Sequence, residues 1–396
     1  MKLLKTKAIL LFIFFLTIMF FSNDFGLINI EKTAIVTAIA IDYNTNANEK
    51  EKYLVTAQIA VPEVSNTTAE NPKAIIEGKG STIAEAINSI GNISGWYPKL
   101  AFCNLIVCGK ETANENLLKE IDFFARTLNI LDSATVILAE NSASELLKTA
   151  SPFDNISSFA LQKILLKDPG FDNDVAVMDV RNFVKGCFSK TESAFMPLVK
   201  IIKQTTLDKE NSENKNSGKN GNKGDVLFDA TTTALFKSGK FVYSLDKELT
   251  TTFNLLTKKS SSTTLPITLN MGEKQENYLL SFLDVTPKIK LNATENDLIL
   301  NLELKIYAKI VDDDAPYSDA TYTKNVPLSK AVVKQTENTL TKRMERLVNA
   351  LKESKCDFFN LSELLYRFNY KHYFRYKDNY LDKLTLKTFV SVSGQK

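Results

Sequence analysis

Hydrophobic and polar residues alternate most regularly in residues 298–310. Apolar side chains occupy every second position from Leu298 to Ile310, and most residues between them are polar, such as Glu303 and Lys305. A period of two places alternate side chains on opposite faces of a strand. The pattern therefore predicts a long strand with one face on a core and the other in water.

The rest of the second half predicts further elements around this strand. Residues 229–237 and 240–244 are expected to form a hairpin around Ser238-Gly239. Apolar residues at helical spacing predict a long helix at 329–354. We expect it to lie across the sheet, because the pattern does not persist long enough for a coiled coil. The remaining predicted elements are a helix from Asp246 to about residue 256, strands at 265–270, 277–292 and 383–391, and a helix at 361–368.

Residues 33–203 predict alternating strands and helices. Two β-branched stretches, 33–42 and 53–61, are expected to pair antiparallel, because the loop between them is short and polar. Thr82-x-x-Glu85 and Ser142-x-x-Glu145 are capping boxes, which predict the starts of helices. The other predicted elements are strands at 74–78, 100–108, 134–139 and 195–202, and helices at 82–93, 115–128, 157–166 and 175–188.

A polar segment separates the two halves. Residues 204–225 contain one aliphatic residue, Leu207, and cannot bury enough surface to order themselves. The chain of 396 residues is also too long for one ordinary core. The predicted fold class is α+β and multi-domain, with mixed or antiparallel sheets each flanked by helices. The predicted divisions are a signal-like segment at 1–24, an N-terminal α+β region of one or two subdomains at 25–203, a flexible linker at 204–226 and a C-terminal α+β domain at 227–396.

The first residues resemble an export signal. Lys2, Lys5 and Lys7 precede a run of 14 residues, 8–21, which is apolar apart from Thr17. This length suits the apolar core of a secretory signal and is short for a membrane span. Lysines before the run orient the rest of the chain to the outer side of a membrane. Two fates remain open: cleavage, or retention of residues 8–30 as a marginal anchor.

Composition narrows the classes of partner. The formal net charge of +3 is too small to indicate nucleic-acid binding, and we reject that class of partner. Hydrophobic residues make up 44% and charged residues 24% of the chain, as in ordinary folded proteins. We therefore expect a folded protein that does not bind nucleic acid.

The four cysteines are expected to be small buried side chains. Cys103 and Cys108 lie in the predicted strand 100–108, five positions apart, so they are expected on opposite faces and cannot bridge each other. Cys187 and Cys356 have no nearby partner in the sequence. Metal ligation is not expected with this spacing and a single histidine.

The sequence contains no recognisable set of catalytic residues. His372 is the only histidine, and no Gly-x-Ser-x-Gly motif supplies a nucleophile elbow. In residues 78–82, Gly80 separates Lys79 from Ser81, so the stretch is not a phosphate-binding loop. The acidic run 312–314 lacks the spaced ligands of a calcium loop. We predict no catalytic, cofactor-binding or metal-binding residue and no cofactor, although paired glycosidase carboxylates cannot be judged from a linear sequence.

Aromatic and basic residues alternate irregularly in residues 366–380. Such a segment could lie at a bilayer surface, where aromatic rings and lysines are enriched. It could instead seal the end of a domain, with its basic residues in water. We favour the second interpretation.

Five short motifs stand in order along the chain. They are Ala34-Ile35-Val36-Thr37-Ala38-Ile39-Ala40-Ile41-Asp42, Gly80-Ser81-Thr82-Ile83-Ala84-Glu85-Ala86-Ile87, Ser144-Glu145-Leu146-Leu147-Lys148, Thr233-Ala234-Leu235-Phe236-Lys237-Ser238-Gly239-Lys240-Phe241-Val242 and Phe282-Leu283-Asp284-Val285-Thr286-Pro287-Lys288-Ile289. They resemble motifs of the Ger(x)C family, the C subunit of bacterial spore germinant receptors. The first motif has Ala at both positions where the family has Gly.

The resemblance implies a non-enzymatic, membrane-associated subunit on the outer side of the spore inner membrane. It would assemble with membrane-embedded A and B subunits and support nutrient-triggered germination. The family's fold of three small α+β units agrees with the mixed halves predicted above. Asp24 stands where the family carries its lipidated cysteine, so a thioether anchor cannot form there. The alternatives are an exported hydrolase acting on the cell wall and a solute-binding accessory protein.

Overall fold

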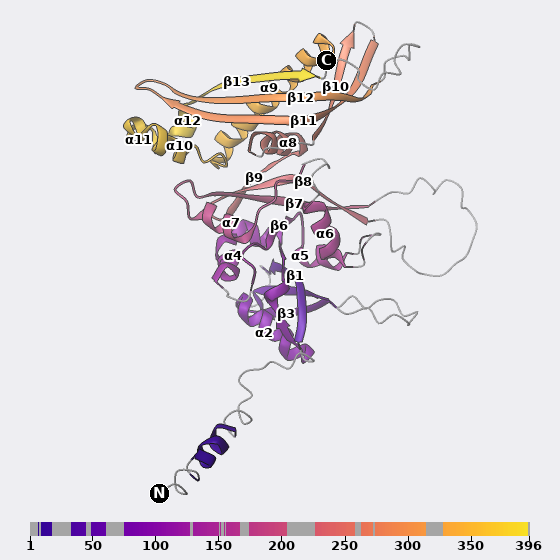
Figure 1. The fold of residues 1–396 in the computed structure, drawn as a ribbon, viewed down its shortest axis with the longest axis vertical. Helices are drawn as coiled ribbons and strands as arrows, with labels where there is room; N and C mark the ends of the chain where they lie inside the picture. Colours follow the sequence, from indigo (N-terminus) through magenta and orange to yellow (C-terminus); the bar gives the residue numbers. More distant parts are fainter. Residues whose placement is uncertain are drawn as a thin grey trace, which may run out of the picture.

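The structure is a computed structural model in which part of the chain is described. The described residues are 7, 9–17, 33–44, 49–60, 75–126, 130–149, 151, 154, 156–166, 174–203, 226–257, 263–271, 274–313 and 328–394. They contain two sheets, one above the other in Figure 1, with helix α8 between them. Both sheets are mixed and carry helices, which confirms the α+β class predicted from the sequence.

The first sheet has a parallel centre. Strands β1, β5, β6 and β7 run parallel, and antiparallel strands flank them on both sides. The predicted antiparallel pairing of β1 with β2 is confirmed. In sheet order the strands are β3 (Ile75–Gly80), β2 (Tyr53–Ile59), β1 (Thr33–Tyr43), β5 (Leu105–Cys108), β6 (Thr135–Ala139), β7 (Ser193–Lys203), β8 (Val226–Lys237) and β9 (Lys240–Leu245), with β4 (Tyr97–Lys99) beside β1.

Helices cover both faces of this sheet. In β5, Ile106 faces the core formed with α2, α4 and α7, whereas Leu105 and Val107 face the core formed with α5 and α6. All four residues of β5 are buried. The helices are α2 (Ile83–Ser94), α3 (Lys110–Glu115), α4 (Leu117–Arg126), α5 (Ala143–Lys148), α6 (Ser157–Leu165) and α7 (Val180–Cys187), and the short helices η2 (Glu49–Glu51) and η3 (Leu100–Phe102) lie in loops.

The first sheet continues beyond the predicted boundary at residue 227. β7 pairs antiparallel with β8 up to Lys203 opposite Val226. The Ser238-Gly239 turn, with φ of 51° and 79°, then returns the chain as β9, so the predicted hairpin is confirmed. The predicted linker at 204–225 lies outside the described residues. The division of the chain into domains stays a prediction.

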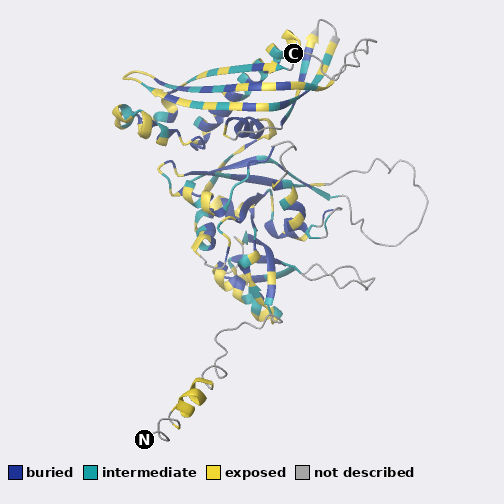
Figure 2. Cartoon of the chain, in the orientation of Figure 1, coloured by how far each residue is buried: buried dark blue, intermediate teal, exposed yellow. Residues whose placement is uncertain are grey.

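The second sheet has one buried and one open face. Its order is β10 (Thr263–Met271), β11 (Lys274–Ala293), β12 (Leu298–Asp313) and β13 (Leu384–Gly394), with β13 parallel to β12 and the other pairs antiparallel. In β12 the even-numbered residues from Leu298 to Ala308 are buried, and Lys305, Tyr307 and Lys309 are exposed. This alternation, visible as bands in Figure 2, confirms the predicted strand.

Helices α8 (Lys247–Thr257) and α9 (Lys330–Ser354) cover the buried face. The predicted stripe of α9, including Leu340, Met344 and Leu347, is buried, and Ser329 caps the helix as its side chain accepts from the Val332 amide at 3.2 Å. Asp246 caps α8 by accepting from the Leu249 amide at 2.8 Å, as predicted. Three short helices close this part of the chain: α10 (Leu361–Phe368), α11 (Tyr370–Tyr376) and α12 (Tyr380–Lys383).

The segment after α9 joins the two sheets. The Asp357 amide donates to Ser193 Oγ at 2.9 Å, and Cys356 Sγ lies 3.3 Å from the Phe236 carbonyl oxygen. Phe253 of α8 packs edge-to-face against Phe195 of β7 and Phe358, with ring centroids 4.9 and 5.3 Å apart. Buried hydrogen bonds and aromatic contacts therefore connect the first sheet with the helices of the second.

Two predictions for the first half are wrong. The helix expected at 175–188 begins only at Val180, because Asp179 caps it there and the preceding residues hydrogen-bond to the edge of β6. The strand expected at 100–108 begins only at Leu105, after the 3₁₀ turn η3. Cys103 and Cys108 therefore share one core instead of pointing to opposite faces.

The expected state of the cysteines is confirmed. All four thiols are free and buried. Burial raises the pKa of Cys103, Cys187 and Cys356 to about 12 in each case, and also raises that of Cys108. A thiol held neutral in this way is a poor nucleophile and metal ligand.

Candidate functional site

Asp42 fills the position where a parallel sheet of this kind usually binds a ligand. Ligands of open α/β sheets bind beyond the carboxyl ends of the strands. Asp42 stands at that end of β1, and its carboxylate accepts from Ser142 Oγ at 3.0 Å and from the Ala143 and Ser144 amides at 2.8 and 2.7 Å. The amides at the start of α5 are therefore satisfied by the protein's own carboxylate.

Glu77 extends this network on β3. Its carboxylate accepts from Ser144 Oγ at 2.8 Å and pairs with Lys148 Nζ at 2.5 Å. The hydrogen bond from Lys148 is the main reason why the pKa of Glu77 lies below its usual value. Asp42 and Glu77 together attach α5 to strands β1 and β3, which is a structural role.

Three buried acids lie elsewhere in the described structure, and they are Glu120, Asp174 and Asp357. Glu120, on α4, accepts a hydrogen bond from the Tyr53 hydroxyl at 2.6 Å. Its other carboxylate oxygen has no hydrogen-bond partner among the described residues. Burial raises the pKa of both groups, because removal from water disfavours their charged forms. The pair packs between β2 and α4 and faces the core of the first sheet.

Asp357 is another of these buried acids, with 1% of its surface exposed. It accepts from the Leu361 and Ser362 amides at 2.9 and 3.0 Å and from the Tyr380 hydroxyl at 2.9 Å. Burial raises its pKa above the usual value despite these bonds. These contacts start α10 and hold α12 beside it.

The histidine, the acidic run and the glycine-rich stretch considered as candidate sites lie apart from one another. His372 is half-buried on α11, whereas Asp312 is exposed at the end of β12. Asp314 lies outside the described residues. Gly78 lets β3 approach α2 closely, since a Cβ there would lie 2.1 Å from the Ala86 carbonyl oxygen. Within the described part of the chain, His, Cys, Asp and Glu form no group of three that could hold a metal ion.

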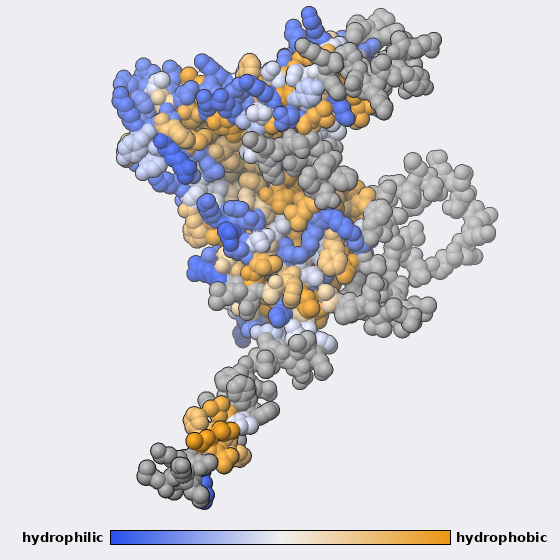
Figure 3. All heavy atoms as spheres, viewed as in Figure 1, coloured by the Kyte–Doolittle hydropathy of each residue, from blue (hydrophilic) through white to orange (hydrophobic). Residues whose placement is uncertain are grey.

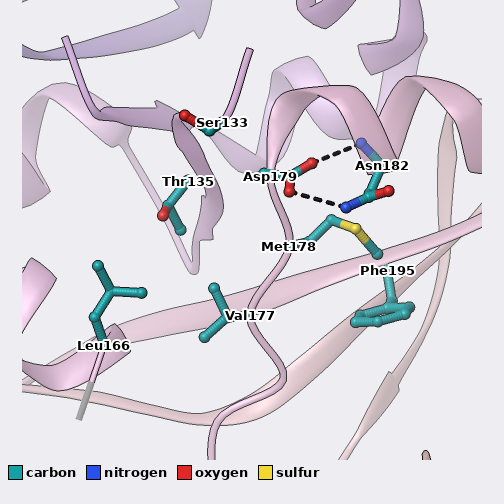
Figure 4. A pocket seen from close by; sticks show the side chains of 8 residues that line it. All are labelled: Ser133, Thr135, Leu166, Val177, Met178, Asp179, Asn182 and Phe195. Atoms are coloured by element: carbon teal, nitrogen blue, oxygen red, sulfur yellow. Dashed lines mark hydrogen bonds between the residues drawn. The ribbon is translucent and has the colours of Figure 1, made fainter. Parts of the chain in front are cut away.

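An open pocket of about 380 Å³ lies beside β6, β7 and the segment before α7 (Figure 4). Leu166, Val177, Met178 and Phe195 supply much of its lining. Asp179 is the acidic residue in it, and its carboxylate accepts from the amide and side-chain nitrogen of Asn182 at 2.6 and 2.8 Å. The carboxylate of the pocket therefore serves to cap α7.

Exposed aromatic residues of α10 and α11 form one surface cluster. Tyr366 packs edge-to-face against Tyr370 and Tyr373, and Lys190 lies 4.2 Å from the centre of its ring. Phe374 is 65% exposed, whereas Tyr376 of the same helix is buried. The segment predicted to seal the end of a domain thus buries some of its rings and leaves others in water. It lies far from β3 and α2 in Figure 1.

A second surface cluster was not anticipated from the sequence. We call it the Trp96 patch; its members are Ile35, Ile93, Trp96, Tyr97 and Phe102, all exposed. It joins the start of β1, the end of α2, β4 and η3. The available signal was the scarcity of charge: residues 86–109 contain one charged residue, Lys99.

The N-terminal apolar run is helical at residues 9–17. Its large side chains, Ile9 to Leu16, are 46–70% exposed, and Figure 3 shows them as a hydrophobic surface. Within the described residues, no helix has both the length and the apolar character needed to span a membrane.

Comparisons with known families match both halves of the chain. Residues 27–201 match the family described as the spore germination protein N-terminal domain, and residues 231–393 match the GerAC-like C-terminal family of spore germination proteins. The chain belongs to the GerAC-like spore germination proteins. This membership confirms the family resemblance inferred from the five motifs.

A solved structure shares the fold of this GerAC-like protein. It is described as the crystal structure of the GerBC protein, with 15% sequence identity and a TM-score of 0.52. The match covers 93% of this chain and 100% of that chain. A comparison with curated protein sequences finds no match. The five motifs of the GerAC-like protein fall on β1, the β3–α2 connection, α5, the β8–β9 hairpin and β11.

Proposed function

We propose that this protein is a non-enzymatic C subunit of a spore germinant receptor. It acts on the outer side of the spore inner membrane and assembles with integral membrane A and B subunits to support nutrient-triggered germination. The observation that carries this proposal is the family match, which spans both halves of the chain in the order expected for the family.

The way in which the acids are used supports an assembly role. Asp42 and Glu77 attach a helix to the first sheet, and Asp357 starts α10. Each of these carboxylates is committed to contacts within the protein. A catalytic pair, by contrast, needs two carboxyl groups facing a common space for the substrate.

Membrane attachment is proposed to rest on the apolar N-terminal run. The exposed side chains from Ile9 to Leu16 lose contact with water if they enter lipid, which favours attachment. Asp24, outside the described residues, offers no thiol for a thioether-linked lipid. We therefore propose that the protein is held by its apolar run and its partners, on the outer side of the membrane.

Copurification tests the assembly. The C-terminus is tagged, spore inner membranes are solubilised gently, and the proteins that copurify are identified. We expect two multi-pass membrane proteins in fixed proportion to the tagged chain. A tagged, unrelated membrane-anchored spore protein serves as the control for nonspecific recovery. Recovery of the protein alone, or only from soluble fractions, would contradict the proposal.

A further inference from the structure

The Trp96 patch brings together exposed apolar side chains from elements that contact one another. Ile93, Phe102 and Tyr97 are 72, 56 and 54% exposed, and Trp96 and Ile35 are 48 and 41% exposed. Single exposed apolar residues are common on soluble proteins, but clustered ones mark surfaces that contact a partner or a membrane. The five side chains come from four neighbouring elements, so their proximity is a product of the fold and not of one helix or strand.

The patch lies where the N-terminal segment joins the first sheet. Thr33, Ala34 and Ile35 pair in parallel with Tyr97, Pro98 and Lys99. The 16 peptide units between residue 17 and Thr33 span at most about 55 Å when fully extended. The chain that leads from the apolar run therefore ends directly beside the patch. If the run is in a membrane, the patch is held within reach of the same membrane.

The composition of the patch suits a lipid headgroup region. Trp and Tyr have an apolar body and a polar group, and both are enriched at membrane–water interfaces. Lys99, the one charged residue of 86–109, is exposed and can approach an anionic headgroup. The acid of α2, Glu85, is in the first turn, at the opposite end of the helix from Ile93. That stretch thus offers a cation and no carboxylate to an anionic surface.

We propose that the Trp96 patch inserts into the headgroup region of an anionic bilayer and holds the first sheet against the membrane. The inference rests on the membrane attachment proposed above. A short apolar anchor gives marginal binding, and stable attachment usually needs a second signal. The patch supplies that second signal and also sets which end of the first sheet faces the lipid.

The single tryptophan makes the proposal directly measurable. The full chain is mixed with vesicles of phosphatidylcholine and phosphatidylglycerol, and flotation reports whether it attaches. Trp96 fluorescence is then compared in vesicles with and without lipids brominated along the acyl chain. We expect a blue shift of the emission and quenching that is strongest for bromine close to the headgroup, because Trp96 is the only tryptophan in the chain.

A double variant and a matched control distinguish lipid contact through the patch from nonspecific attachment of the chain to vesicles. The double variant Ile93→Asn, Phe102→Asn leaves Trp96 in place and is expected to lose most of the quenching while the chain still floats with vesicles. The matched control is Phe368→Asn, which removes an aromatic ring that is 75% exposed on α10. Its quenching should equal that of the wild type. Circular dichroism and the thermal midpoint check that each variant is folded.

The possible failures are distinguishable. Flotation without quenching of Trp96 would overturn the lipid contact and leave membrane attachment standing. Absence of both flotation and quenching would overturn attachment and the patch proposal together. A blue shift in vesicles that brominated lipid does not quench would also overturn the lipid contact, because Trp96 would then be shielded from water without touching the acyl chains. If quenching in the double variant equals that of the wild type, the lipid contact of Trp96 does not depend on the rest of the patch, and the proposal is wrong.

Discussion

The two sheets differ in how many of their faces are buried. In the first sheet, helices cover both faces of the central strands, and consecutive residues such as Leu105 and Ile106 enter two different cores. In the second, Leu302 is buried beneath α8 and α9, whereas its neighbour Glu303 lies on the open face. Parallel sheets in α/β proteins are usually covered on both sides, and antiparallel sheets often keep one face in water.

This difference indicates where each sheet can take part in contacts. The centre of the first sheet has no open face, so its functional surface must lie at its margins, as the Trp96 patch does. The second sheet carries an open face with Lys305, Tyr307 and Lys309 exposed along β12. Its outer face is therefore available over the length of a long strand.

Substitutions of adjacent residues test the comparison between the two sheets, and they have the largest expected effect on stability. Leu105→Ala and Ile106→Ala should each lower the free energy of unfolding by about 2–5 kcal/mol, because each opens a cavity in a separate core. In β12, Leu302→Ala should cost a similar amount, whereas Glu303→Ala should stay within about 0.5 kcal/mol. Urea denaturation of the four variants measures these values.

The pattern across the four variants decides the outcome. Three large losses and one small change support one open face in the second sheet and none in the centre of the first. A small effect at either Leu105 or Ile106 would mean that one face of the first sheet is open. The ion pairs of Glu303 with Lys288 and Lys305, at 3.7 and 3.8 Å, are partly exposed and contribute little to this comparison.

The extent of the first sheet is tested at Gly239. This residue has φ of 79°, and a Cβ there would lie 2.6 Å from the Leu118 Cβ. Gly95 has a similar φ of 71° but would have no atom within 4 Å of its Cβ. Both substitutions to Ala carry the cost of the left-handed conformation, about 1–2 kcal/mol. Gly239→Ala should cost about 1–3 kcal/mol more, because it also forces the hairpin away from α4.

Equal losses of stability in Gly95→Ala and Gly239→Ala would contradict this packing. The comparison matters because the hairpin comes after the predicted linker, yet the Gly239 carbonyl accepts from the Leu117 amide at 2.9 Å. A larger loss at Gly239, measured by thermal and urea unfolding of both variants, would show that β8 and β9 are packed as part of the first sheet.

Local patterns predicted elements more reliably than their arrangement. The alternation of β12, the stripe of α9, the caps at Thr82 and Ser142 and the Ser238-Gly239 turn are all confirmed, because each depends on residues close together in the chain. The strand at 100–108 was placed too early, since a continuous apolar run does not mark where a 3₁₀ turn gives way to a strand.

Contacts between distant residues could not be predicted from one sequence. Asp42 accepts from the Ala143 amide 101 residues further along the chain, and Ser193 Oγ accepts from the Asp357 amide 164 residues further along. No local pattern signals either bond. The Trp96 patch was missed for the same reason, because β1 brings Ile35 beside β4 only after folding. The absence of charge in residues 86–109 was visible, but it is equally typical of a buried segment.

The closed packing of the first sheet also predicts a pH effect at Glu120. Burial raises the pKa of this acid above its usual 4.5, so the folded state holds the proton more tightly than the unfolded state. The contribution of Glu120 to the stability of the fold is therefore complete below pH 4.5, and it is lost as the pH rises through the raised pKa. The variant Glu120→Gln cannot ionise there, so its stability relative to wild type should rise with pH above about 4.5.

Glu77→Gln provides the matched control with the opposite sign. The hydrogen bond from Lys148 lowers the pKa of Glu77, so its contribution is present above pH 4.5 and is lost as the pH falls through the lowered value. Urea unfolding of wild type and both variants is measured from pH 3 to 8, a range that brackets the usual carboxyl pKa values. It gives the difference in unfolding free energy between each variant and the wild type. We expect the two stability differences to change with pH in opposite directions. Glu120 is enclosed between β2 and α4, whereas Glu77, at the edge of the same sheet, has Lys148 Nζ at 2.5 Å. Parallel slopes would mean that Glu120 is hydrated in solution, and that the face of the first sheet beneath α4 is more open than the structure indicates.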